Sequence, residues 1–101
     1  VIPILSLGGI GVISVLSNVR PAAVHDMVME YLNGNIKSAL DIQLKYLDLI
    51  EALFCEVNPI PVKAALKLLG YDVGGLRLPL TELEDANRAR LKESMESLKE
   101  N

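Results

Sequence analysis

The hydrophobic pattern at the start of the chain differs from the pattern that follows it. Residues 11–15, Gly-Val-Ile-Ser-Val, are short, β-branched and apolar on both faces. This pattern is typical of a strand buried on both sides, as in a parallel sheet that helices cover. No other segment resembles a partner, and a strand cannot satisfy its backbone groups alone. The sequence therefore predicts one buried strand that pairs with another copy of the chain, or with sheet partners that the chain lacks.

Beyond this strand, apolar residues recur at helical spacing and predict about four helices. Pro21 suits the first turn of the first helix, and Asn33-Gly34 ends it. The apolar face of this helix consists of Val24, Met27, Val28, Tyr31 and Leu32. A second helix is predicted over residues 36–54.

The predicted helix over residues 36–54 has two apolar sides. One side consists of Leu40, Leu44, Leu47 and Phe54. The other consists of Ile42, Tyr46, Leu49, Ile50 and Leu53. So wide an apolar surface predicts burial on two sides, against the chain's own domain and against another subunit.

Two further helices complete the pattern. Asn58 and Pro59 are predicted as the cap and first residue of the third helix, which Gly70 ends. Residues 81–84, Thr-Glu-Leu-Glu, match a capping box and predict the start of the fourth helix, which reaches about residue 98. Its apolar stripe is Leu91, Met95 and Leu98.

Composition narrows the class of protein. The 101 residues suffice for one small domain, and because only 4% are aromatic its core must be aliphatic. A net charge of −3 provides no electrostatic footprint for nucleic acid, so we expect no such partner. The apolar start has no basic region and is too short and glycine-rich to span a membrane, so we expect no membrane partner. The single Cys55 fits a reducing compartment, and we expect a cytoplasmic protein.

Candidate reactive residues are few, and each has an ordinary structural interpretation. His25 is predicted on a helix surface, Cys55 as a buried inert thiol, and Lys63 as a snorkelling or ion-paired lysine. Residues 8–11, Gly-Gly-Ile-Gly, precede a strand, whereas phosphate-binding loops follow one, so we interpret them as a tight turn. We therefore expect no catalytic residue within this chain, no metal and no cofactor.

Two segments stand out by their residue order. The first is residues 7–15, Leu-Gly-Gly-Ile-Gly-Val-Ile-Ser-Val, continuing to Asn18-Val19. The second is residues 58–63, Asn-Pro-Ile-Pro-Val-Lys, followed by Leu69-Gly70 and by Leu-Arg-Leu-Pro-Leu at residues 76–80. Together they resemble the C-terminal portion of the dihydrodipicolinate synthase family. The order and spacing match over essentially the whole chain, and the second segment favours these synthases over the related N-acetylneuraminate lyases.

The resemblance implies a fold of the α/β TIM-barrel class, of which this chain would be a C-terminal fragment. As an isolated chain it would be mainly α-helical, with one buried strand. Residues 1–33 would contain the end of helix 7, strand 8 and helix 8 of the (β/α)8 barrel, and residues 34–101 a C-terminal helical extension. Strands 1 and 7 of the barrel would then be the partners that the predicted strand lacks.

The resemblance also implies an activity, the condensation of pyruvate with aspartate semialdehyde through a Schiff base, on the path to lysine and diaminopimelate. The family's Schiff-base lysine and proton-relay tyrosine precede the start of this chain, so the chain alone is expected to be inactive. One substrate-binding position carries over: Ile13, whose backbone in the family borders the pyruvate site. Gly9 and Gly11 would shape the approach to it. The family also implies a homo-oligomer, a tetramer at full length.

Two alternatives stay open. The chain could be a stand-alone helical fragment that oligomerises through residues 11–15 and 36–54 and has no enzyme activity. It could also belong to a related pyruvate aldolase such as N-acetylneuraminate lyase, because the residues that select the acceptor are not in this chain.

Overall fold

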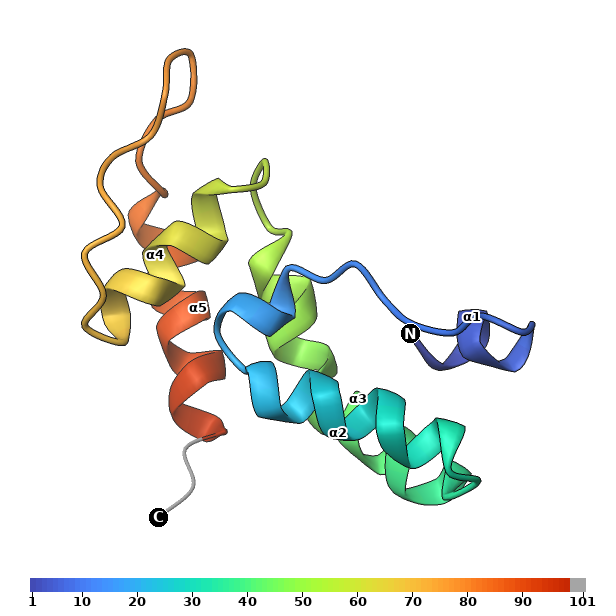
Figure 1. Ribbon diagram of the computed structural model, residues 1–101. Helices are drawn as coiled ribbons and strands as arrows, with labels where there is room; N and C mark the ends of the chain where they lie inside the picture. Colours follow the sequence, from blue (N-terminus) through green and yellow to red (C-terminus); the bar gives the residue numbers. More distant parts are fainter. Residues whose placement is uncertain (99–101) are drawn as a thin grey trace. The chain divides into compact units, whose positions relative to one another are not determined.

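The computed structural model describes residues 1–98, and the regular elements within them are all helices (Figure 1). In chain order these are α1 (Ile2–Ser6), the 3-10 helix η1 (Leu16–Asn18), α2 (Pro21–Leu32), α3 (Ile36–Leu53), α4 (Ile60–Leu68) and α5 (Asp85–Ser97). The chain forms two compact units, Val1–Leu47 and a second that begins at Asp48, so α3 contributes to both. The four predicted helices are confirmed, and the short helices α1 and η1 precede them.

The predicted strand over residues 11–15 is wrong for this chain. Residues 9–14 adopt no regular secondary structure, and the backbone groups of residues 10–13 make no hydrogen bond to another described residue. Ile13, expected to be buried, is fully exposed. The physical reason is that a strand exists only as part of a sheet, and residues 1–98 contain no strand to pair with it.

Glycines end α2 and α4 as the sequence predicts. Gly34 and Gly70 have φ values of 91° and 96°, in the left-handed region that side chains with a Cβ rarely adopt. After α4, the N–H of Gly70 donates to the carbonyl of Lys67 and the N–H of Tyr71 donates to the carbonyl of Leu66, both at 3.0 Å. This paired arrangement is a Schellman motif, and it satisfies carbonyls that the helix leaves without partners.

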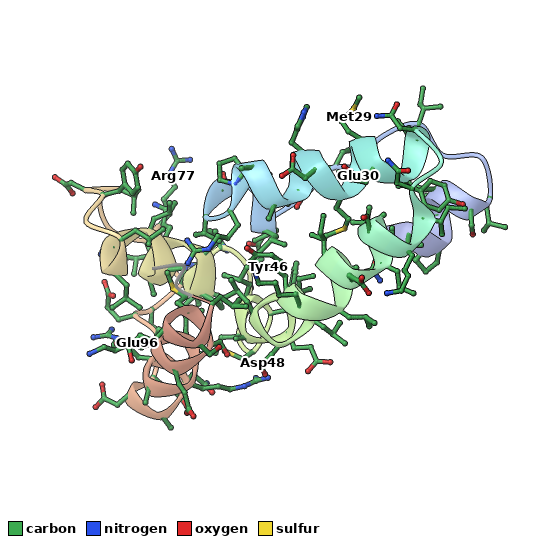
Figure 2. All side chains as sticks on the ribbon, turned by 90° about the horizontal axis from the view of Figure 1, so that it is seen from below. Met29, Glu30, Tyr46, Asp48, Arg77 and Glu96 are labelled. Carbon is green, nitrogen blue, oxygen red and sulfur yellow. The ribbon has the colours of Figure 1, made fainter. Side chains whose placement is uncertain are left out.

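In the first unit, α2 contacts both α1 and η1. The buried side chains at these contacts are Leu5, Leu16, Val19, Val24 and Met27. The backbone N–H of Ile2 donates to Oε1 of Gln43 at 2.8 Å, which ties the start of the chain to α3. Met29 lies on the outer side of α2, in line with its exposure (Figure 2).

The two apolar sides predicted for α3 have different surroundings. Tyr46, Leu49 and Leu53 are buried. The opposite side, between 40% and 57% exposed, consists of Leu40, Leu44, Leu47 and Phe54. Burial on two sides is therefore confirmed for one side only, and the other side of α3 is left uncovered by residues 1–98.

In the second unit, α4 packs against α5. The buried residues of this pair and its loops include Ile60, Val62, Ala65, Leu83, Leu91 and Met95. The helix α4 begins at Ile60 with Pro59 as its N-cap, one residue later than predicted. Pro61 instead takes the place in the first turn, where a missing N–H costs no hydrogen bond.

The predicted capping box at residues 81–84 is also wrong. The helix α5 begins at Asp85, its N-cap is Glu84, and the cap side chain makes no capping hydrogen bond. Instead, Oε2 of Glu56 accepts from the backbone N–H of Glu84 at 3.0 Å and from Nδ2 of Asn87 at 2.9 Å. A carboxylate from the loop after α3 thus supplies the bond to the N-cap N–H that a capping box supplies from within the helix.

Candidate functional site

Residues 8–15 join α1 to η1 and include Ile13, the predicted substrate-binding position. At the start of this segment, the N–H of Gly9 donates to the carbonyl of Ile4 at 3.1 Å. A Cβ on Gly9 would lie 2.9 Å from that carbonyl oxygen, whereas a Cβ on Gly11 would meet no atom within 4 Å. The close approach to α1 therefore requires glycine at position 9, while Gly11 is surrounded by open space.

The middle of the segment is apolar and uncovered. Ile10 is 89% exposed and Ile13 is 104% exposed, relative to a reference residue. The peptide groups of residues 10–13 also have no hydrogen-bond partner among the described residues. Exposed apolar side chains beside unpaired peptide groups are typical of a segment that another surface completes.

A pair of serines ends the segment. The backbone N–H of Ser17 donates to Oγ of Ser14 at 3.2 Å, and Oγ of Ser17 donates to the carbonyl of Ser14 at 2.8 Å. Nδ2 of Asn18 donates to the carbonyl of Val15 at 3.0 Å. These side-chain bonds replace backbone partners and lead into η1. This pair was not predicted, although two serines three residues apart are a signal for such a turn.

The other candidate reactive residues have structural surroundings. His25 is exposed on α2, as predicted. Cys55 is a free thiol and is half-buried rather than fully buried. Nζ of Lys63 donates to the carbonyl of Gly75 at 2.7 Å, so this lysine holds the loop between α4 and α5. Among the described residues, no hydrogen bond or ion pair joins any two of His25, Cys55 and Lys63.

Two further properties concern residues 1–98. No group of three or more His, Cys, Asp or Glu side chains is arranged there to hold a metal ion. None of the helices in this part of the chain combines the length and the apolar character needed to cross a membrane.

Known protein families include one whose sequence pattern extends over this chain. The pattern of the dihydrodipicolinate synthetase family matches residues 1–98. The 4-hydroxy-tetrahydrodipicolinate synthase of Lachnoclostridium phytofermentans is 55% identical over 98 residues, which are 97% of this chain and 33% of that protein.

Solved structures of dihydrodipicolinate synthases also match this chain. The dihydrodipicolinate synthase of Thermotoga maritima superposes with a TM-score of 0.92 at 41% identity, over 95% of this chain and 32% of that one. A structure described as the first monomeric dihydrodipicolinate synthase variant superposes with a TM-score of 0.91 at 41% identity, over 94% of this chain and 32% of that one. The chain thus spans about a third of the length of the relatives that it matches.

Proposed function

Because the chain belongs to the dihydrodipicolinate synthetase family, we propose that it is a segment of a Schiff-base lyase that condenses pyruvate with aspartate semialdehyde. This reaction would serve lysine and diaminopimelate biosynthesis in the cytoplasm. The chain is a mostly helical piece of the TIM-barrel fold. The observation that carries the proposal is the match of residues 1–98 to the family, together with a segment at residues 10–13 whose peptide groups have no hydrogen-bond partner among residues 1–98.

Within that enzyme we place residues 1–33 at the end of helix 7, strand 8 and helix 8, and residues 34–101 in the C-terminal extension, of which residues 99–101 lie outside the described residues. Two features support this placement. The helix α1 ends just before residues 9–14, and α2 follows them. In the complete barrel, neighbouring strands would supply the hydrogen bonds that the peptide groups of residues 10–13 lack here, and the segment would then become a strand.

Ile13 is the residue of this chain that we place beside pyruvate, through its backbone. Its full exposure and its unpaired peptide groups support that role. Lys63 is not suited to be the Schiff-base lysine, because a nucleophilic lysine must be neutral and desolvated, whereas its Nζ donates to the carbonyl of Gly75. As the family resemblance implies, the lysine that attacks pyruvate would come from outside this chain.

A chimeric enzyme tests the proposal. Residues 1–98 of this chain replace the matching third of the Lachnoclostridium phytofermentans synthase. We expect the chimera to condense pyruvate with aspartate semialdehyde and to form a borohydride-stable pyruvate adduct, measured by a coupled assay and by intact mass. The isolated chain should form no adduct. A folded but inactive chimera, or an adduct on Lys63 of the isolated chain, would contradict the proposal.

Variants of the chimera test the position of Ile13. Ile13→Asp places a negative charge beside the pyruvate carboxylate, and we expect kcat/KM to fall by about tenfold or more. Ile13→Val keeps the backbone and the apolar side chain and should leave kcat/KM unchanged. Leu78→Asp is the matched control, because Leu78 is also almost fully exposed but lies in the loop before α5. An equal loss of kcat/KM in the Leu78→Asp variant would show that Ile13 does not lie beside pyruvate.

The uncovered side of α3 supports a second role, association between copies. Three large apolar side chains along one face of α3 form the kind of patch that drives assembly: Leu40, Leu44 and Leu47. We place this face at a subunit contact of a homo-oligomer, a tetramer for the full-length enzyme. Sedimentation of the chain should show dimers or larger species that Leu44→Glu converts to monomers. A compact monomer at high concentration would contradict this role.

A further inference from the structure

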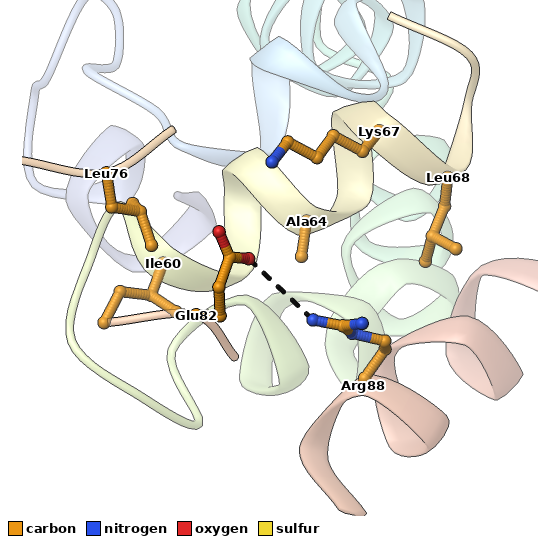
Figure 3. A pocket seen from close by; sticks show the side chains of 7 residues that line it. All are labelled: Ile60, Ala64, Lys67, Leu68, Leu76, Glu82 and Arg88. Carbon is orange, nitrogen blue, oxygen red and sulfur yellow. Dashed lines mark ion pairs between the residues drawn. The ribbon is translucent and has the colours of Figure 1, made fainter. Parts of the chain in front are cut away.

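A cavity of about 270 Å³ lies beside α4 and α5 in the second unit (Figure 3). Its apolar lining consists of Ile60, Ala64 and Leu68 from α4 and Leu76 from the following loop. The spacing of four residues places the three α4 side chains on one face of the helix. A cavity of this size suits a molecule smaller than a typical drug or cofactor.

Three charged side chains complete the lining: Lys67 from α4, Glu82 from the segment before α5, and Arg88 from α5. Figure 3 shows Glu82 and Arg88 directed toward each other, with Oε2 and Nη2 3.9 Å apart. Nη2 of Arg88 also donates to the carbonyl of Leu83, at 3.4 Å. Both contacts are long and both charged side chains are exposed, so the ion pair is weak and leaves other guanidinium N–H groups available.

Lys67 contributes the second positive charge. Within residues 1–98 its Nζ makes no hydrogen bond or ion pair. The cavity therefore combines an apolar lining with two cations, one of which is only loosely held by a carboxylate. A carboxylate from outside the chain has the chemistry to replace Glu82 on Arg88, because guanidinium binds carboxylate through two parallel hydrogen bonds.

We propose that this cavity binds a small aliphatic carboxylate. The carboxylate displaces Glu82 and binds Arg88, Lys67 adds electrostatic attraction, and the carbon chain covers Ala64 and Leu76. Burial of the chain makes a branched carboxylate a better ligand than acetate, by about fourfold for each methylene removed from water. The site lies wholly in the second unit and does not depend on the pyruvate chemistry proposed above.

The test is a titration of the isotopically labelled, full 101-residue chain with 3-methylbutanoate, followed by amide chemical shifts. We expect saturable shifts at Ala64, Lys67 and Arg88, and at least tenfold weaker binding of both acetate and the uncharged 3-methylbutanamide. Arg88→Gln should weaken binding about tenfold, and Ala64→Leu should abolish it by filling the cavity. Shifts that are absent, or that lie outside the cavity, would overturn the proposal.

If the ligand displaces Glu82 from Arg88, neutralising Glu82 should change the affinity in the opposite direction to neutralising Arg88. Glu82→Gln should strengthen binding several-fold, because the competing carboxylate is removed. Glu96→Gln is the matched control: it makes the same change in net charge at an exposed position of α5 and should leave binding unchanged. Equal strengthening in both variants would mean that net charge alone attracts the anion, and would refute the specific site.

Discussion

Residues 10–13 and the packed faces of α4 and α5 are both apolar, yet only the helix faces are buried. In the helical pair, Ala65 and Leu91 are completely buried. The start of α5 has a partner in Glu56, and the end of α4 has the turn at Gly70. In the segment, Ile13 is fully exposed, and the peptide groups have no partner among the described residues.

The comparison shows that apolar character alone does not bury a segment. A helix satisfies most of its own backbone groups and needs only one covered face to be stable. A strand needs a neighbour for its backbone as well as its side chains. This chain therefore completes its helices by itself, while its strand-like segment depends on a partner that residues 1–98 do not provide.

The largest expected effect on stability comes from shortening a buried side chain of the α4–α5 pair, compared with an exposed one in residues 10–13. Leu91→Ala leaves a cavity in the α4–α5 core, and we expect the free energy of unfolding to fall by about 2–5 kcal/mol. Ile13→Ala should change it by less than about 0.5 kcal/mol, because the side chain is already in water. Urea unfolding of the isolated chain measures both. A comparable loss in the two variants would show that the segment is packed in solution.

A smaller effect is expected at the start of α5. Glu56→Ala removes the acceptor for the N–H of Glu84 and for the side chain of Asn87, and should lower the free energy of unfolding by about 1 kcal/mol. Glu51→Ala is the control, since this exposed glutamate in α3 makes no such bond. Unfolding curves that do not distinguish the two variants would show that the distant cap contributes nothing to stability.

A loss smaller than that of the Glu56 variant is expected at Gly9, immediately before residues 10–13. Gly9→Ala brings a Cβ to 2.9 Å from the carbonyl oxygen of Ile4, so the end of α1 must shift and its last hydrogen bond weakens. We expect a local loss of about 0.5–1 kcal/mol, seen as faster amide exchange at Gly9 and in α1. Gly11→Ala should leave exchange unchanged, because its surroundings are open. If amide exchange became faster in both variants, the cause would be the lower flexibility of alanine compared with glycine, and not the contact with Ile4.

The sequence by itself determined the helices and the family. The bounds of α2 and α3 agree with the prediction to within one residue, because proline, glycine and apolar spacing act over a single helical turn. Gly34 and Gly70 end their helices through φ values that few other residues adopt. The motifs at residues 7–15 and 58–63 identified the family that the comparisons confirm.

Only the tertiary structure decided the rest. The predicted strand at residues 11–15 failed because its conformation depends on a neighbour, and α5 starts at Asp85 rather than near residue 81 because a carboxylate 28 residues away caps it. The cavity with Lys67, Glu82 and Arg88 comes from three separate segments, so no local spacing signals it. Ile13 was chosen from the family resemblance, and its role beside pyruvate stays a prediction. Local rules suffice where a segment satisfies its own backbone, and they fail where the partner is distant or lies outside the described residues.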